Sequence, residues 1–531
     1  MIKNKGVFIC LSGNGGLSVR SIKRFIDLMI SFGYTSIELG LDDMIKIKEE
    51  PYFGYLRGGY SIDDLIELDK YAVSKGVELI PSCQFLGHFG YLSKIPEYEN
   101  IIDIDDILLI DEPRTYELIE NIIKTLRKCF SSNKINIAFD EAHHVGLGKY
   151  LDKHGYVNRF DLMLKHLNKV NAIANKHGFI CHMWSDMFFK FANHGIYYDK
   201  NVNFDKKIMD MVPNNVGLCY WDYYSTDKDL LDSMFKSHLQ FNRELYFAGS
   251  VSTCNGFAPS NIGSLERLKI QLLEARKFNI ENYLITLWPD DGFECSYFSA
   301  LPGLFEASLL IDGKKLNDKE KNRFKKITGI DFDIYLLLDE PNRSKVNPDL
   351  KDINITCKSL LYNDPFLGWK DFELEKIMPI DYESMVKKYD EVIPLIPKKY
   401  RTQYIKLMEL CACLAYKYDL GIRTRKAYKS KDLKELKDII KTYDLACSAL
   451  LRFKKTFYKQ WMEENIPHGF DVHEIRLGGL YMRLKDCKQR LSLFVKGKIK
   501  SIPELEEELL PYAKFGSMYN LYKGFATVRI I

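Results

Sequence analysis

The sequence predicts a (β/α)8 TIM barrel, in the α/β class, followed by an α-helical C-terminal domain. Short apolar segments of strand length alternate with amphipathic helical segments in eight units, over roughly the first 310 residues. After about Ala307 the strand-like segments and the glycines thin out, and the sequence becomes helical. Eight units in this length are typical of the barrel, whereas an open doubly wound sheet would not usually run to eight regular units.

The predicted strands are short and apolar, and most of them end in polar or aromatic residues. Their expected ranges are 6–11, 35–39, 77–81, 135–144, 179–186, 216–224, 245–249 and 283–292. The helices between them are predicted over 18–32, 61–75, 113–129, 159–177, 228–242 and 264–278. Ser18 and Ser61 stand where helix N-caps are expected, and Gly33 ends the first helix.

We therefore expect three parts in the chain. These are a catalytic barrel over 1–312, a linker with short helices over 313–380, and an α-helical domain over 381–531. Long helices are predicted near 397–428, 432–455 and 471–493, and 354–366 is a plausible linker. No motif indicates a function for the helical part, so a scaffold or a homodimer surface is the default expectation.

Composition narrows the class of protein. The net charge is +4 and no basic block is present, which argues against a nucleic-acid partner. The 12 cysteines are scattered, which is typical of buried reduced thiols in a cytoplasmic protein. No signal-peptide core and no apolar run long enough for a membrane span are present, so no membrane association is expected.

The stretch 135–144 carries the strongest chemical signal. Its apolar residues end in Asp140 and Glu141, and His143 and His144 follow. Charged groups are tolerated where a strand leaves its layer, so both carboxylates are expected at the carboxyl-terminal mouth of the barrel, where active sites lie. An acidic helix cap beside a structural histidine would give a similar pattern.

The other strand ends place polar and aromatic residues on the same face. The residues expected there are Asp42, Asp43, His88, Trp184, Asp186, Trp221, Asp222, Tyr223, Trp288 and Asp290. Three of the five tryptophans belong to this set. A single tryptophan at a barrel mouth is usually part of the core. Three of them among carboxylates indicate a sugar site, because rings stack on the apolar face of a sugar and carboxylates accept hydrogen bonds from its hydroxyls.

The adjacency of Asp140 and Glu141 favours one type of glycoside hydrolysis. Neighbours on one strand cannot lie on both sides of a scissile bond as nucleophile and acid. They do suit a substrate-assisted reaction, in which the 2-acetamido group of the sugar is the nucleophile. One carboxylic acid protonates the leaving oxygen, and its neighbour orients the acetamide and stabilises the positive oxazolinium.

Four stretches carry a family resemblance. They are Phe-Asp-Glu-Ala-His-His-Val-Gly-Leu-Gly (139–148), Pro-Tyr-Phe-Gly-Tyr-Leu-Arg (51–57), Gly-Phe-Ala-Pro (256–259) and Thr-Leu-Trp-Pro-Asp-Asp-Gly (286–292). Together they resemble glycoside hydrolase family 20, the β-N-acetylhexosaminidases, and most of all its bacterial branch with a helical C-terminal domain. The resemblance covers about residues 5–310 well and the remainder loosely.

The resemblance implies roles for the strand-end residues. Glu141 would be the general acid/base, and Asp140 would orient the acetamide. Trp184, Trp221 and Trp288 would form the walls of the N-acetyl pocket. Tyr223 would donate a hydrogen bond to the acetamide oxygen, with Tyr224 as a competitor for this role. Asp290 would bind sugar hydroxyls, and His88 and His143 would support the acidic pair. For either histidine, a purely structural role is the alternative.

Three positions depart from the family pattern. Gly13 stands where the family usually has an arginine that grips sugar hydroxyls, and Ser252 and Cys254 stand where this branch often has aromatic residues. These changes remove a bidentate donor and stacking area. They motivate a second hypothesis, a sugar-binding homologue with weak or no hydrolysis.

A third hypothesis is a metal-dependent hydrolase that uses Asp140, His143, His144 and His182. It is disfavoured because His143 and His144 are adjacent and no His-x-x-x-His spacing exists. The main hypothesis is a retaining, substrate-assisted exo-β-N-acetylhexosaminidase without metal or organic cofactor. Its partner would be a glycan with a terminal N-acetylhexosamine, and the choice between GlcNAc and GalNAc stays open.

Overall fold

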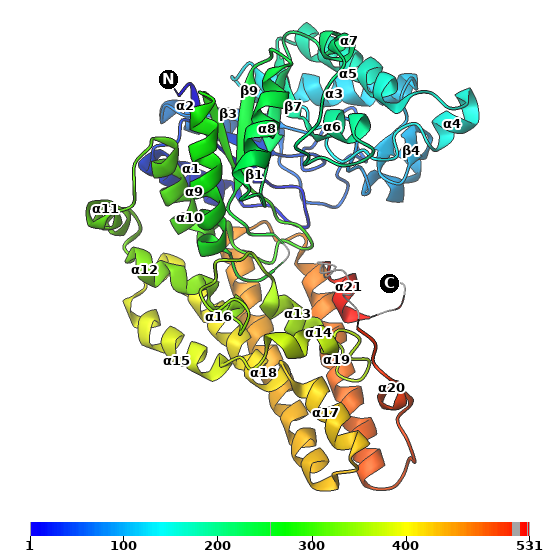
Figure 1. The fold of residues 1–531 in the computed structure, drawn as a ribbon, viewed down its shortest axis with the longest axis vertical. Helices are drawn as coiled ribbons and strands as arrows, with labels where there is room; N and C mark the ends of the chain where they lie inside the picture. Colours follow the sequence, from blue (N-terminus) through cyan, green and yellow to red (C-terminus); the bar gives the residue numbers. More distant parts are fainter. Residues whose placement is uncertain (1, 255, 512–520, 528, 530–531) are drawn as a thin grey trace.

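The computed structural model describes residues 2–254, 256–511, 521–527 and 529. A barrel formed by the N-terminal part lies at one end, and helices of the C-terminal part extend from it (Figure 1). The predicted domains 1–312 and 381–531 include some positions outside the described residues, namely 1, 255, 512–520, 528, 530 and 531.

Eight parallel strands close into the barrel in the order β1-β10-β9-β8-β7-β6-β3-β2. They are β1 (Asn4–Cys10), β2 (Ser36–Gly40), β3 (Glu78–Ser82), β6 (Lys134–Asn136), β7 (Ile180–Trp184), β8 (Gly217–Trp221), β9 (Leu245–Ser250) and β10 (Asn282–Leu287). Closure is made by β1, which pairs with β2 on one side and with β10 on the other. The predicted (β/α)8 barrel is therefore confirmed.

Amphipathic helices cover the outside of the barrel. They are α1 (Val19–Phe32), α2 (Ile62–Ser74), α3 (Pro113–Cys129), α5 (Arg159–Lys176), α8 (Lys228–Leu239), α9 (Asn261–Lys277) and α10 (Leu301–Ile311). In α1 the buried face includes Ile22, Phe25 and Met29, and the Ser18 hydroxyl accepts a hydrogen bond from the Ser21 amide. This apolar stripe is the pattern that predicted the helix.

The loops at the carboxyl ends of the strands carry smaller elements. These are β4 (Ile102–Ile104), β5 (Ile107–Leu108), α4 (Lys149–His154), α6 (Asp186–Ala192) and α7 (Lys206–Met211). The antiparallel pair β4–β5 lies between β3 and α3 in the chain.

The predicted strand 135–144 is wrong in its extent, because β6 ends at Asn136. The Asn136 side chain accepts a hydrogen bond from the Ala138 amide at 2.9 Å, while Ile137 and Ala138 still form backbone hydrogen bonds with His182 and Trp184 of β7. Ala138 and Phe139 then take positive φ values of 58° and 73°. A left-handed backbone cannot continue a strand, so Asp140 and Glu141 lie on a loop beyond the strand end.

The C-terminal part is helical, as predicted. Its helices are α11 (Asp318–Thr328), α12 (Phe332–Tyr335), α13 (Thr356–Tyr362), α14 (Asp371–Leu374), α15 (Tyr382–Val392), α16 (Lys398–Lys417), α17 (Leu420–Lys429), α18 (Leu433–Glu464), α19 (Phe470–Val495), α20 (Pro503–Glu506) and α21 (Lys523–Ala526). It packs against the barrel. The buried ammonium of Lys406 on α16 donates to the carbonyls of Phe257 and Glu294 at 3.2 and 2.9 Å.

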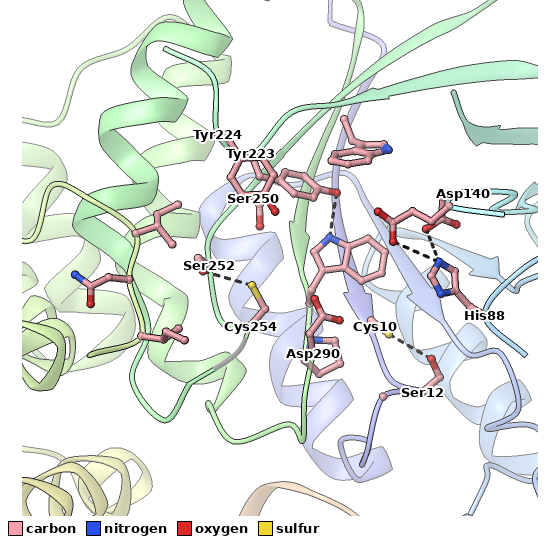
Figure 2. Close-up of a pocket in the computed structure, with 18 of the residues that line it drawn as sticks. Cys10, Ser12, His88, Asp140, Tyr223, Tyr224, Ser250, Ser252, Cys254 and Asp290 are labelled. Atoms are coloured by element: carbon pink, nitrogen blue, oxygen red, sulfur yellow. Dashed lines mark hydrogen bonds and ion pairs between the residues drawn. The ribbon is translucent and has the colours of Figure 1, made fainter. Parts of the chain in front are cut away.

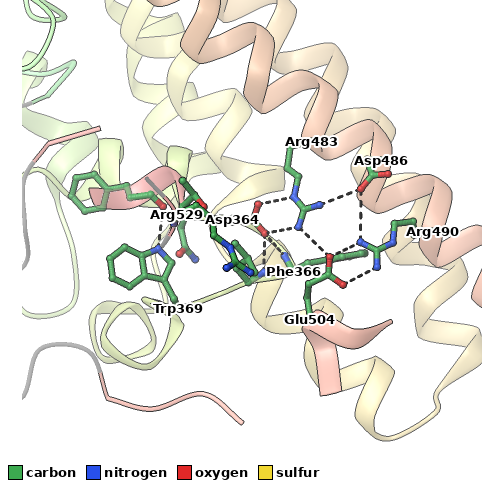
Figure 3. A network of polar contacts seen from close by, with 12 residues as sticks. Asp364, Phe366, Trp369, Arg483, Asp486, Arg490, Glu504 and Arg529 are labelled. Carbon is green, nitrogen blue, oxygen red and sulfur yellow. Dashed lines mark hydrogen bonds and ion pairs between the residues drawn. The ribbon is translucent and has the colours of Figure 1, made fainter. Parts of the chain in front are cut away.

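The stretch 354–366, predicted as a plausible linker, contains α13, and every residue of that helix is buried. Asp364, just after α13, pairs with Arg483 of α19 at 2.7 Å, and Arg490 pairs with Glu504 of α20 (Figure 3). This stretch is thus fixed to the long helices rather than suspended between two domains. Across the part of the chain that the structure describes, no helix combines the length and hydropathy needed to cross a bilayer.

Candidate active site

A cavity of about 950 Å³ opens at the carboxyl ends of the barrel strands. Residues at or just beyond the ends of all eight strands line it, as expected for this fold. A second set of lining residues comes from the C-terminal part, between Ser344 and Ile377. The cavity is therefore built by two regions that are far apart in the sequence.

Asp140 lies beside His88 on one side of this cavity (Figure 2), and Glu141 lines the same cavity. The His88 Nε2 atom is 3.2 Å from Asp140 Oδ2 and 3.9 Å from Glu141 Oε2. The Gln84 side chain donates to Asp140 Oδ1 at 3.1 Å. Asp140 therefore has a partner on each oxygen, whereas Glu141, whose side chain is 46% exposed, faces the open cavity.

Charges around this cluster set two opposite pKa shifts. Burial alone would lower the pKa of His88, but Asp140, with help from Glu141 and Asp106, raises it to about 10. Burial would raise the pKa of Asp140, but His88 and Gln84 outweigh it and hold the pKa below its usual value. At neutral pH the cluster is an imidazolium beside a carboxylate.

The loop that carries Glu141 is held in an unusual conformation. Ala138, Phe139 and Glu141 all have positive φ values, which cost energy for residues other than glycine. The Glu141 amide donates to Asp186 Oδ2 at 3.2 Å, and Lys190 Nζ lies 2.9 Å from the same oxygen and 3.8 Å from Glu141 Oε1. These contacts from α6 fix where the Glu141 side chain enters the cavity.

Aromatic rings form the floor and one wall. Trp184 is buried, and its ring centroid lies 5.9 Å from that of Trp288, while Phe8 packs against both at 5.6 and 4.7 Å. Trp221 stacks on Tyr223 at 5.2 Å. The structure thus brings the three predicted tryptophans to one cavity.

The two tyrosines of the β8 loop are placed differently. Trp288 Nε1 donates to the Tyr223 hydroxyl oxygen at 3.0 Å, and this contact fixes the Tyr223 side chain at the cavity (Figure 2). Tyr224 is 63% exposed. Tyr223 therefore has the better geometry for a fixed donor, and Tyr224 offers an open ring face.

The loop after β10 brings Asp290 to the cavity. Its next residue, Asp291, is held by two cations of the helical part, with Lys358 Nζ at 2.7 Å and Arg476 Nη2 at 2.9 Å. The same two cations pair with the buried Glu294 at 2.7 and 3.3 Å. The Asp290 loop is therefore fixed by residues outside the barrel.

His473 and Arg476 of the helical part also approach the Asp290 loop closely at Gly292. His473 Nε2 lies 2.7 Å from the Gly292 carbonyl oxygen. Burial and the charge of Arg476 lower the pKa of His473 to about 3, so the ring is neutral and its Nε2–H donates. Gly292 has a φ of 132°, and a Cβ there would lie 2.7 Å from an Arg476 nitrogen. Glycine is thus required for this close approach.

Gly13, the position without the expected arginine, lines the cavity. A Cβ at this position would lie 2.7 Å from Pro289 Cγ, so a side chain has no room. Arg57 reaches the same place from the loop after β2. It donates to the Gly13 carbonyl at 3.0 Å and to Asp43 Oδ2 at 2.7 Å, and it also lines the cavity.

Neither His143, predicted to support the acid pair, nor the alternative metal set is found at the site. His143 is exposed and does not line the cavity, and its carbonyl accepts from Arg159 at 2.7 Å. The metal set is not assembled, since His144 pairs with Asp105 at 2.8 Å and His182 with Glu38 at 3.0 Å inside the barrel. Within the described ranges, His, Cys, Asp and Glu nowhere gather three together as a metal site would need.

Sequence reasoning missed several cavity residues. Gln84 could have been assigned, because it follows β3 at the carboxyl end of that strand. Arg57 stands in one of the four stretches that carry the family resemblance but was given no role, and the lining residues between 344 and 377 gave no such signal. Ser252 and Cys254, by contrast, lie in the cavity as their position after β9 predicts, with their side chains 3.6 Å apart.

Comparison with solved structures finds hexosaminidases at low sequence identity. An exo β-N-acetylglucosaminidase from Vibrio harveyi in complex with N-acetylglucosamine has 15% identity and a TM-score of 0.46, and the match covers 61% of this chain and 57% of that one. A β-N-acetylhexosaminidase from Bacteroides fragilis has 18% identity, coverage of 61% and 69%, and a TM-score of 0.46. One from Streptomyces coelicolor has 15% identity, coverage of 62% and 70%, and a TM-score of 0.46.

Two family models match the chain itself. The catalytic domain of glycosyl hydrolase family 20 matches residues 17–247, which run from the first barrel helix to within β9. The glycoside hydrolase 20C C-terminal domain matches residues 333–522, which include the helices that hold the Asp290 loop. The chain belongs to glycoside hydrolase family 20.

Proposed function

We propose that the protein is a retaining exo-β-N-acetylhexosaminidase that uses the acetamido group of its substrate as the nucleophile. The observation that carries this proposal is the arrangement of Asp140 and Glu141, adjacent in sequence and placed beside His88 at an aromatic cavity. The substrate would be a glycan with a terminal β-linked N-acetylhexosamine. A cytoplasmic location and a homodimer stay predictions.

In the first step, the acetamide oxygen of the bound sugar attacks its own anomeric carbon, and Glu141 gives a proton to the departing glycosidic oxygen. The bond to the leaving group breaks, and a positive oxazolinium forms. Asp140 accepts a hydrogen bond from the acetamide N–H, and its negative charge lies beside the developing positive charge. The Tyr223 hydroxyl, which is held in place by Trp288, donates to the acetamide oxygen of the bound sugar before the attack.

In the second step, the Glu141 carboxylate takes a proton from water as that water attacks the anomeric carbon. The oxazolinium opens, and the acetamide and the original anomeric configuration are restored. Trp184, Trp221 and Trp288 exclude bulk water from the acetyl group, which strengthens the interactions of Asp140 with the intermediate.

The test compares Glu141→Gln with the unchanged protein on two classes of substrate, nitrophenyl N-acetyl-β-hexosaminides and N-acetylhexosaminyl disaccharides. Loss of a general acid is expected to lower kcat by about 10²–10⁴. The loss should be greater for the disaccharides, because a sugar alcohol needs protonation to leave and nitrophenolate does not. Glu117→Gln, an exposed position on α3, is the matched control.

Inhibition by a thiazoline analogue of the oxazolinium intermediate gives a second readout, because its binding does not require turnover. Nanomolar to micromolar inhibition of the unchanged protein is expected. Full activity of Glu141→Gln on both classes, or no binding of the thiazoline, would overturn the proposal.

A further inference from the structure

The cavity is larger than a single sugar needs, and it extends beyond the acid pair. Its volume of about 950 Å³ lies near the upper end for sites that enclose drug-sized ligands, about 300–1,000 Å³. Ser252 and Cys254 lie on the side away from Asp140 and His88 (Figure 2). The lining residues Ser344, Val346, Asn347, Asp352, Ile353, Asn354 and Ile355 come from the C-terminal part.

This second region of the cavity exposes apolar surface. Val346 is 62% exposed and Tyr224 is 63% exposed, although both line a cavity. Ile353 and Ile355 are only partly buried and line it too. Exposed apolar groups that are gathered in a concave site are typical of ligand contact.

The polar groups of this region are neutral or paired. Asn354 Oδ1 accepts from the Thr356 amide and hydroxyl at 3.3 and 3.0 Å, and its amide nitrogen has no partner in the part of the chain that the structure describes. The Arg267 guanidinium lies 3.3 Å from the Asp352 carboxylate, so the two charges compensate each other. An uncharged ligand with hydroxyl groups fits this lining better than an anionic one.

We propose that Val346, Ile353, Asn354 and Ile355, together with Tyr224, bind an uncharged sugar residue that is attached to the terminal N-acetylhexosamine. This inference rests on the proposed function. Tyr224 lines the same cavity as Glu141 and lies close enough to it for the Glu141 charge to act on the Tyr224 hydroxyl, so a leaving group that Glu141 protonates meets Tyr224 and the region beyond it. The C-terminal domain thereby selects which glycans are cleaved, and the sugar ring lies between Tyr224 and the apolar side chains of 346–355.

The test uses three substrates that share a terminal β-linked GlcNAc. One has a methyl aglycone, which is too small to fill the region, one has galactose and one has glucuronic acid. The variants are Val346→Asp and Val346→Lys, and Leu395→Asp, at an equally exposed position of the C-terminal part, is the control. For each substrate the variant is compared with the unchanged protein, so differences in leaving-group reactivity cancel.

In Val346→Asp, the ratio of kcat/KM for the galactoside to that for the methyl glycoside is expected to fall about tenfold, because a charged group replaces apolar contact with the ring. In Val346→Lys, kcat/KM for the glucuronide is expected to rise about threefold or more, through attraction to its carboxylate. Leu395→Asp should leave all three substrates unchanged. A gain for one substrate cannot come from damaged folding.

Binding of the thiazoline separates this inference from the proposed function, because it fills only the site of the terminal sugar. If the thiazoline binds and both Val346 variants treat the three substrates as the unchanged protein does, the inference is wrong and the proposed function stands. If the thiazoline fails to bind and no substrate is cleaved, the proposed function is wrong.

Discussion

The two sides of the cavity are held in place by different parts of the chain. On the acid side, Asp140 and Glu141 are positioned by His88, Gln84 and Asp186, all of which lie on loops of the barrel. On the opposite side, the loop with Asp290 is held by Lys358, Arg476 and His473 of the helical part. The acid pair is thus positioned by the barrel, whereas the position of Asp290 depends on the C-terminal domain.

The largest expected effect tests the attachment of the Asp290 loop. Lys358→Met removes one of the two cations that pair with the buried carboxylates of Asp291 and Glu294, and Arg476 is the other. Breaking a buried pair from one side costs about 3–5 kcal/mol. We expect the free energy of unfolding, measured with urea by circular dichroism, to fall by that amount.

Lys388→Met is the matched control, because Lys388 is half exposed in its pair with Glu340. A half-exposed pair contributes about 0–1 kcal/mol. If Lys358→Met and Lys388→Met lost the same free energy of unfolding, the buried ion pairs of Lys358 would not be what fixes the Asp290 loop.

The second prediction compares one carboxylate from each side. Asp140→Asn removes the negative charge next to the oxazolinium and is expected to lower kcat by about 10²–10³. Asp290→Asn should mainly raise KM, because its contacts with sugar hydroxyls exist before and during the reaction. Steady-state kinetics on a nitrophenyl hexosaminide measures both. A larger loss of kcat in Asp290→Asn would reverse the assignment of the two sides.

The third prediction concerns pH on the acid side. His88 holds the pKa of Asp140 low, so His88→Asn leaves burial to raise it. Activity needs the Asp140 carboxylate, and activity is lost as pH falls through its pKa. In the pH profile of kcat/KM, the acid limb, where activity falls at low pH, is therefore expected to move to higher pH in His88→Asn.

The matched control is Asp106→Asn, whose carboxylate is 3.9 Å from His88 Nδ1. The pKa of His88 is about 10 in the unchanged protein, so His88 stays protonated near neutral pH in this control. Its acid limb should not move. An unchanged acid limb in His88→Asn would refute the role of the imidazolium.

The smallest effect is expected for Gln84→Leu. The Gln84 amide is the weaker of the two groups that lower the pKa of Asp140, since it is neutral. The acid limb should move in the same direction as in His88→Asn and by less. A larger shift than that of His88→Asn would mean that hydrogen bonding, not charge, keeps Asp140 ionised.

The sequence predicted features that depend on neighbouring residues. The barrel was predictable because strand-like and helical patterns alternate along the chain. The Asp140–Glu141 pair was predictable because the two residues are adjacent in the chain. The end of β6 was not predictable, because Ala138 and Phe139 take positive φ values before the apolar run is finished. His143 was misplaced for the same reason, since a turn through Glu141 directs it to the surface.

Long-range contacts were outside the reach of sequence patterns. Arg57 meets Gly13 only because β1 and β2 are neighbours in the barrel, which brings two loops together. The lining residues between 344 and 377 meet the cavity only because α13 packs beside the β10 loop, through Lys358. Their local sequence carries no periodicity or motif that points to a sugar.

The contact between Gly13 and Pro289 limits how this sequence can change over evolutionary time. An arginine at position 13 collides with Pro289 and places a second guanidinium next to that of Arg57. No single substitution can therefore move the cation from the loop after β2 to the end of β1. Positions 13, 57 and 289 are therefore expected to change together, because a cation at position 13 needs both the space that Pro289 occupies and the removal of the Arg57 charge.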